Sequence, residues 1–95
     1  MHKLNPSKKY AKNFEKLDKP NQIAIHAEVE KLQNDPFMGK KLEGKLRGFY
    51  SIHCGKEEDI RVIYYPSDNP EKLVNLVWCG HRKTVYKEFE RFLGV

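Results

Sequence analysis

The sequence predicts an α+β domain with two layers, in which an N-terminal helical hairpin packs on a mainly antiparallel sheet of about four strands. Apolar residues recur every three or four positions through residue 33, which is the period of a helix. From Phe49 onward apolar and polar residues alternate, as they do in strands, and short polar turns separate the segments. The chain has 95 residues, enough for one modest core, so we expect residues 1–95 to form a single domain.

The N-terminal third favours a short strand at His2–Asn5 followed by two helices. Asn5-Pro6-Ser7 resembles a helix start, and the break at Asp18–Asn21 leads into a second helix that runs to about Gln33. A short loop joins the helices, which favours an antiparallel hairpin. Their apolar stripes consist of Tyr10, Phe14 and Leu17 in the first helix and Ile25, Val29 and Leu32 in the second.

A connection rich in Gly and Lys follows at residues 36–47, and we expect Leu42 and Leu46 to hold it against the core. Three strands are then predicted, at residues 49–54, at 60–65 and from about 72 to Cys79. Polar turns separate them at residues 55–59 and 66–70, and Gly80 is expected to end the last strand. Helical spacing in the final segment predicts a short terminal helix from Val85 to Leu93.

The alternation along each strand predicts which side chains face the helices. The inward set is Tyr50, Ile52, Cys54, Ile60, Val62, Tyr64, Val74, Leu76 and Trp78. The opposite face should carry Phe49, Ser51, His53, Arg61, Ile63, Tyr65, Asn75, Val77 and Cys79. His53 and Arg61 would then share an open surface with the edge formed by His81, Arg82 and Lys83.

The composition points to a soluble, cytoplasmic protein with an anionic partner. Lys and Arg number 18 against 13 Asp and Glu, giving a net charge of +5, although many proteins are this basic without binding nucleic acid. The N-terminus lacks an apolar leader, and no apolar segment approaches the roughly 20 residues of a membrane span. Cys54 and Cys79 lack a Cys-x-x-Cys spacing, which favours reduced thiols, and no spacing matches a zinc motif. We therefore expect no metal or cofactor.

The polar group after the last strand contains the side chains that a phosphodiester site needs. His81 supplies an imidazole, Arg82 a guanidinium, Lys83 an ammonium and Tyr86 a phenol. Cleavage by an RNA 2′-hydroxyl requires a base, cations that stabilise the phosphorane and an acid for the leaving oxygen. Each of these residues, and Arg61 on its strand, could equally be a solvated surface residue.

Three motifs in sequence order make the chain similar to the RelE/ParE superfamily of type II toxins. They are Leu42-x-x-x-Leu46-Arg47-Gly48-x-Tyr50-Ser51-Ile52, Ile60-Arg61-Val62-Ile63-Tyr64 and Gly80-His81-Arg82-Lys83-x-Val85-Tyr86. The resemblance runs through the whole chain and is closest to RelE-type members, which cut mRNA in the ribosomal A site. ParE-type members share the fold and inhibit DNA gyrase, so the fold alone does not decide the target.

The resemblance also implies roles for particular residues. Arg61, Arg82 and Tyr86 fall on catalytic positions of the RelE branch, whereas two lysine positions of RelE are occupied here by Ser51 and His53. Relatives in the wider group use histidine, which leaves His53 and His81 as alternative candidates for the general base. The implied RNA- and ribosome-binding residues are Lys40, Lys41, Lys45, Arg47 and Lys83, although these could also be merely solubilising.

The function implied by the resemblance is that of a toxin that cleaves ribosome-bound mRNA through 2′-hydroxyl attack, without metal or cofactor. Its expected partners are the ribosome, mRNA and a cognate acidic antitoxin, in a heterodimer or heterotetramer, with no membrane. A ParE-like gyrase inhibitor is the alternative, and a degenerate toxin that only binds its antitoxin is a third possibility.

Overall fold

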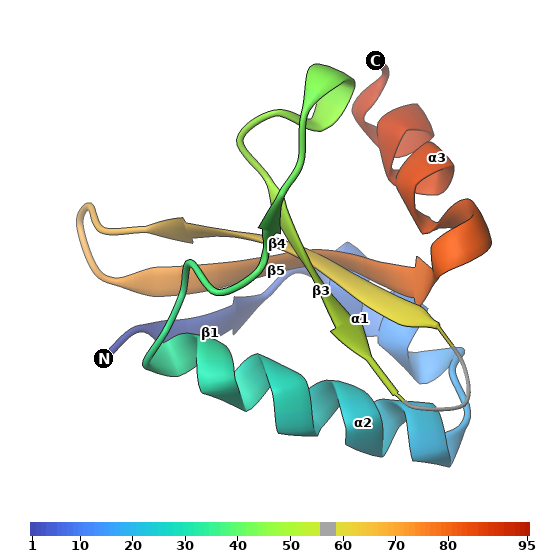
Figure 1. Cartoon of the computed structure of the whole chain (residues 1–95), viewed down its shortest axis with the longest axis horizontal. Helices are drawn as coiled ribbons and strands as arrows, with labels where there is room; N and C mark the ends of the chain where they lie inside the picture. Colours follow the sequence, from blue (N-terminus) through green and yellow to red (C-terminus); the bar gives the residue numbers. More distant parts are fainter. Residues whose placement is uncertain (56–58) are drawn as a thin grey trace.

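A mixed β-sheet forms the centre of the molecule in the computed structural model, which describes residues 1–55 and 59–95 (Figure 1). Within these residues the sheet has five strands, in the order β1-β5-β4-β3-β2. Strand β1 runs parallel to β5, and the other pairs are antiparallel. The strands are β1 (Lys3–Pro6), β2 (Lys40–Lys41), β3 (Tyr50–Cys54), β4 (Ile60–Ser67) and β5 (Leu73–His81). The α+β prediction is confirmed, and the two-residue β2 brings the expected four strands to five.

Helices α1 (Lys8–Glu15) and α2 (Lys19–Val29) form the predicted hairpin on one face of the sheet (Figure 1). Helix α1 starts after Ser7, whose Oγ accepts a hydrogen bond from the Tyr10 N–H at 3.0 Å. Helix α2 begins at Lys19, inside the predicted break at Asp18–Asn21, because Asp18 caps the helix and Pro20 fits its first turn. Helix α2 itself ends at Val29, and a 3₁₀ turn, Glu30–Gln33, continues the helical segment to the predicted end at Gln33.

The apolar core between the hairpin and the sheet confirms the predicted phase of β3 and β4. Both helices contribute their apolar stripes, from which Tyr10, Ile25, Val29 and Leu32 are buried. The sheet contributes Ile52, Cys54, Ile60, Val62, Tyr64, Val74, Leu76 and Cys79. Cys54 and Cys79 are both free thiols, and burial raises the pKa of each to about 12, so neither is a ready nucleophile.

The predicted phase of β5 is wrong for Trp78 and Cys79. A bulge separates two registers, in which Ile63 pairs with Trp78 but Tyr64 pairs with Leu76, so that Val77 is an extra residue. Val77 and Trp78 consequently both pack on the face opposite the hairpin, and Cys79 returns to the hairpin side. The bulge thus reverses the alternation just before β5 reaches the polar edge, which is formed by His81, Arg82 and Lys83.

The second face of the sheet is covered by helix α3 (Arg82–Leu93) and by the short 3₁₀ turn Gly44–Leu46 (Figure 1). We predicted this face to be open, but Ser51 and Ile63 are buried on it. The smaller core here comprises Leu46, Ile63, Val85 and Phe89, with Leu42, Phe49, Val77, Trp78 and Tyr86 packed against it. Leu42 and Leu46 therefore hold the Gly- and Lys-rich connection against the protein, as predicted.

Two boundaries near the polar edge differ from the prediction. Strand β5 continues through Gly80 to His81, which pairs with Ile60, and α3 begins at Arg82 instead of Val85. Strand β4 likewise extends into the expected turn at 66–70, because Pro66 and Ser67 still pair with β5. The predicted turn at 55–59 includes residues 56–58, which lie outside the described residues.

In the described part of the chain, no helix has the length and apolar content that crossing a membrane would require.

Candidate functional site

The polar edge of the sheet is built where β3, β4 and the start of α3 meet. His53 on β3 pairs directly with Arg61 on β4, so their side chains leave the same face of the sheet. Arg82 follows immediately after β5, and its N–H donates to the Asp59 carbonyl at 2.8 Å. The fold thereby brings together side chains from three separate parts of the sequence.

The Asp59 carboxylate lies among three of these side chains. Arg61 approaches it side-on, with Nε 3.0 Å from Oδ1 and Nη2 3.5 Å from Oδ2. His53 Nε2 is 3.3 Å from Oδ1, and Arg82 Nε is 3.8 Å from Oδ2. Desolvation pulls the pKa of the Asp59 carboxyl upward, but the hydrogen bond and charge of Arg61, with the charges of His53 and Arg82, hold it below its usual range.

A groove of about 510 Å³ runs along the sheet beside this cluster. Arg61, Arg82 and Tyr86 all line it, so the structure brings together three of the residues predicted from the sequence to be catalytic. Arg82, Tyr86 and Glu90 stand four residues apart on one face of α3. The remaining lining residues are Lys40, Lys41, Leu42, Glu43 and Leu46 from the connection before β3.

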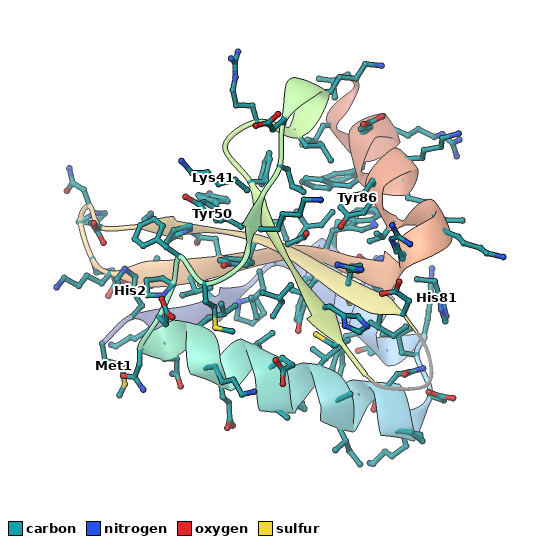
Figure 2. The ribbon with its side chains drawn as sticks, in the orientation of Figure 1. Met1, His2, Lys41, Tyr50, His81 and Tyr86 are labelled. Carbon is teal, nitrogen blue, oxygen red and sulfur yellow. The ribbon has the colours of Figure 1, made fainter. Side chains whose placement is uncertain are left out.

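Tyr86 lines the groove and is anchored to the sheet. Its hydroxyl donates a hydrogen bond to Ser51 Oγ at 3.0 Å, and Ser51 is buried in the sheet. Figure 2 shows Tyr86 extending from α3 toward the sheet. The phenol ring is thus held in the groove that the two arginines also line.

The two candidate histidines occupy different places. His53 reaches the cluster through Asp59 and remains half-exposed, whereas His81 pairs with Ile60, which faces the hairpin-side core. His81 therefore leaves the strand on the face opposite Arg61, and Figure 2 places it at the end of β5. It lines a neighbouring hollow with Asp59, Arg82 and Lys83.

The predicted RNA-binding lysines and arginine also divide into groups. Lys40 and Lys41 form part of the groove wall, and Arg47 lines an adjoining hollow that shares Lys41. Lys83 lies near Arg82 at the start of α3, and Lys45 is exposed in the 3₁₀ turn. Together these residues surround the groove on the side of the connection and on the side of α3.

Three acidic residues and one serine of this region were not predicted from the sequence to be site residues. Asp59 was assigned only to a polar turn and Glu43 only to a connection, and Ser51 was assigned to the second face and to a lysine position of RelE without a role. Glu90 could have been found from its spacing of eight residues after Arg82 once the helix was known to begin there. Among the described residues, no cluster of three or more His, Cys, Asp and Glu is placed to hold a metal ion.

The lowered pKa of Asp59 predicts a pH-dependent contribution to stability. In the unfolded chain this carboxyl titrates near the ordinary Asp pKa of about 3.9, and in the folded chain it titrates lower. The contribution is therefore complete above about pH 4 and is lost as the pH falls through the folded pKa. We expect the difference in free energy of unfolding between the wild type and Asp59→Asn to shrink as the pH falls from about 6 to about 2. Urea unfolding across this range measures it, and a constant difference would contradict the prediction.

Comparison with known proteins shows the family to which the chain belongs. Residues 4–90 match the family model described as a ParE-like toxin of type II bacterial toxin-antitoxin systems. Curated protein sequences contain no match.

Solved structures show how widely the fold is shared. A double Arg-to-Ala mutant of free E. coli RelE superposes with a TM-score of 0.78 at 17% identity, covering 99% of this chain and 97% of that chain. The toxin in the intact E. coli RelBE toxin-antitoxin complex gives 0.73 at 18% identity, over 85% and 96% of the two chains. The YoeB/ParE toxin from Agrobacterium tumefaciens gives 0.68 at 19% identity, over 84% and 98%.

At these identities the structural likeness establishes the fold, and the family model, which spans nearly the whole chain, establishes the family. The protein belongs to the ParE-like toxins of type II bacterial toxin-antitoxin systems.

Proposed function

We propose that this toxin is a RelE-like endoribonuclease that cuts mRNA on the ribosome. The observation that carries the proposal is the convergence of Arg61, Arg82 and Tyr86 on one groove, from β4 and from α3. Two guanidinium groups and a phenol beside a cavity open to solvent suit a scissile phosphate and an adjacent base. Residues spread over the surface merely for solubility would not need to line the same groove.

The geometry supports a division of chemical roles. Asp59 binds the Nε and Nη2 side of Arg61, and the Nη1 side is the one we assign to phosphate oxygens. Arg82 supplies a second cation at the groove wall. Attack by the 2′-hydroxyl on phosphorus forms the P–O bond of a cyclic phosphate and breaks the bond to the 5′-oxygen, which takes up a proton. We assign the base to His53, because it lies with Arg61 whereas His81 leaves the opposite face.

The start of α3 gives independent support for an anionic ligand. Its first turn contains Arg82 and Lys83 and no acidic residue, although cations are disfavoured at the positive end of a helix dipole. An arriving phosphate would interact favourably with both the side-chain charges and the positive end of the helix dipole. A local arrangement that is unfavourable until a ligand binds is expected at a functional site.

The lysine-rich surroundings suit a partner as highly charged as the ribosome. Lys40 and Lys41 line the groove, Arg47 and Lys83 line hollows that share residues with it, and Lys45 is exposed in the Gly44–Leu46 turn. Contacts between such side chains and RNA phosphates strengthen binding at low salt and weaken as salt rises. We propose that these residues position the toxin against ribosomal RNA while the groove receives the message.

The histidine assignment predicts a pH effect. Histidine is the side chain whose charge ordinarily changes between about pH 5 and 8. We expect the cleavage rate of the wild type to change with pH in this interval, and His53→Ala to lower the rate by about 10²-fold and flatten the profile. His81→Ala is the matched control and should keep the wild-type profile. A pH profile that is the same in His53→Ala and the wild type would remove His53 from the mechanism.

We further propose that an acidic antitoxin inhibits this toxin in a heterodimeric or heterotetrameric complex, as the RelBE structure pairs a toxin with an antitoxin. A separate hollow of about 320 Å³ has a mainly apolar lining. It includes Phe49, Tyr65, Val77, Phe89, Phe92 and Leu93, together with Lys8 and Lys9. An amphipathic segment with apolar anchors and acidic flanks fits this combination. Co-purification with the product of the adjacent reading frame, weakened by Phe92→Asp, would support the proposal, and a non-toxic, unpartnered chain in its native host would contradict it.

Expression of the toxin in bacteria tests the proposed target. Translation should stop and translated messages should acquire new ends, while DNA replication continues at first. The family model is described as ParE-like, which favours gyrase inhibition as the second candidate. Arrest of replication with intact mRNA would support that candidate and overturn the nuclease, and absence of any growth effect would point to a chain that only binds an antitoxin.

A further inference from the structure

Asp59 has more partners than an ordinary surface carboxylate. Arg61, His53 and Arg82 all approach it, although they come from β4, β3 and α3. By contrast, Asp68, just beyond the far end of β4, pairs with His2 and is 71% exposed, while Asp59 is 41% exposed. An exposed pair such as His2–Asp68 has little structural consequence. Convergence of three groups restricts all of them together.

The backbone of Asp59 adds a fourth connection. Its carbonyl accepts the Arg82 N–H at 2.8 Å, at the first residue of α3. His81, the residue before the helix, makes no side-chain capping hydrogen bond there. The N–H of Arg82 would have no partner within the helix, and Asp59 provides one. A single residue thus ties the start of α3 to β4 through the backbone, and its carboxylate also attracts the exposed Arg82 side chain at 3.8 Å.

The contact with Asp59 sets the orientation of the Arg61 guanidinium group. A side-on carboxylate contact through Nε and Nη2 fixes the plane of the guanidinium, because both hydrogen bonds must lie close to that plane. Arg61 itself is only 21% exposed, so its stem is also held by the sheet. With its plane fixed, the Nη1 group points consistently away from Asp59.

We propose that Asp59 is a positioning residue that holds Arg61, Arg82 and His53 as one preorganised unit for binding the scissile phosphate. The proposal rests on the nuclease function proposed above. Asp59 does not touch the substrate. It reduces the reorientation that the two guanidinium groups and the imidazole would otherwise need when the phosphate arrives.

A simpler role for Asp59, neutralising excess positive charge, predicts a different result from the same variant. Asp59→Asn keeps the size and the backbone carbonyl but removes the negative charge. If Asp59 only neutralises positive charge, Asp59→Asn should bind RNA more tightly than the wild type and cleave it at least as fast. If Asp59 positions its partners, the variant should bind RNA at least as tightly, but kcat on ribosome-bound mRNA should fall by about 10- to 100-fold.

The experiment compares the wild type, Asp59→Asn and Asp68→Asn. The third variant removes the same charge from the other Asp–His pair, at a distance from the groove, and should keep the wild-type kcat and KM. Arg61 is followed in parallel by ¹⁵N relaxation of its Nε–H group, which needs no substrate. We expect this group to be restricted in the wild type and in Asp68→Asn, and mobile in Asp59→Asn.

Either of two results would overturn the proposal: a kcat for Asp59→Asn within about twofold of the wild type, or an Arg61 Nε–H group that is already mobile in the wild type. A wild-type protein that cuts no mRNA would instead refute the nuclease function. The relaxation measurement would then still decide whether Asp59 holds Arg61, so the two failures can be told apart.

Discussion

Replacing Arg61 by alanine is expected to lower mRNA cleavage by about 10²- to 10³-fold, the range found when a preorganised charge is removed from an active site. Arg61 lines the groove and has a guanidinium edge available for a phosphate. The side chain is outside both apolar cores, so the variant should still unfold cooperatively. Arg82→Ala is expected to reduce cleavage similarly. Single-turnover cleavage of mRNA on purified ribosomes measures both effects, alongside urea unfolding.

Arg91→Ala is the matched control, because it removes the same charge from α3 at a position that lines a different hollow. Its cleavage rate should stay within about threefold of the wild type. Loss of cooperative unfolding in Arg61→Ala would mean that Arg61 is structural, and full activity of that variant would contradict its placement in the site.

Replacing Phe89 by alanine is expected to lower the free energy of unfolding by about 3–5 kcal/mol. Phe89 is 1% exposed, and its ring packs edge-on against Phe49 at 5.0 Å and beside Trp78 at 5.7 Å. Removing it leaves a cavity beneath α3, the helix that carries Arg82 and Tyr86 to the groove. Chemical denaturation monitored by Trp78 fluorescence measures the change.

Phe92→Ala provides the comparison, one turn further along the same helix. Phe92 is 51% exposed. Since its ring contacts Trp78 mainly from the solvent side, its loss should cost no more than about 1 kcal/mol. Equal destabilisation by the two substitutions would contradict the assignment of Phe89 to the second core.

The sequence predicts the fold well where one rule applies without interruption. Strands β3 and β4 alternate regularly, and each of their predicted inward residues is in the hairpin-side core. In β5 the bulge at Val77 breaks the rule, and it is invisible in the sequence because Val77 and Trp78 are both apolar. The coverage of the second face was missed for a related reason, since periodicity predicts a terminal helix but not the face on which it packs.

The candidate site shows the same division between what a pattern predicts and what only the fold reveals. Arg61, Arg82 and Tyr86 were selected through resemblance, and the structure places all three along one groove. Their relation to Asp59 could not be predicted, because it depends on where β4 begins and on α3 starting at Arg82. His53 and His81 were expected on one surface, but the pairing of His81 with Ile60 places His81 on the face opposite Arg61.

The most direct measurement of the proposed chemistry uses a defined mRNA on purified ribosomes, with a single 2′-hydroxyl at the cut site replaced by hydrogen. The unmodified message should be cut to give a 2′,3′-cyclic phosphate or a 3′-phosphate and a 5′-hydroxyl, and the modified message should stay intact at that position. With Arg61→Ala the products should form about 10²- to 10³-fold more slowly. Cleavage of the modified message, or inhibition of gyrase supercoiling by a toxin that leaves both messages intact, would contradict the account.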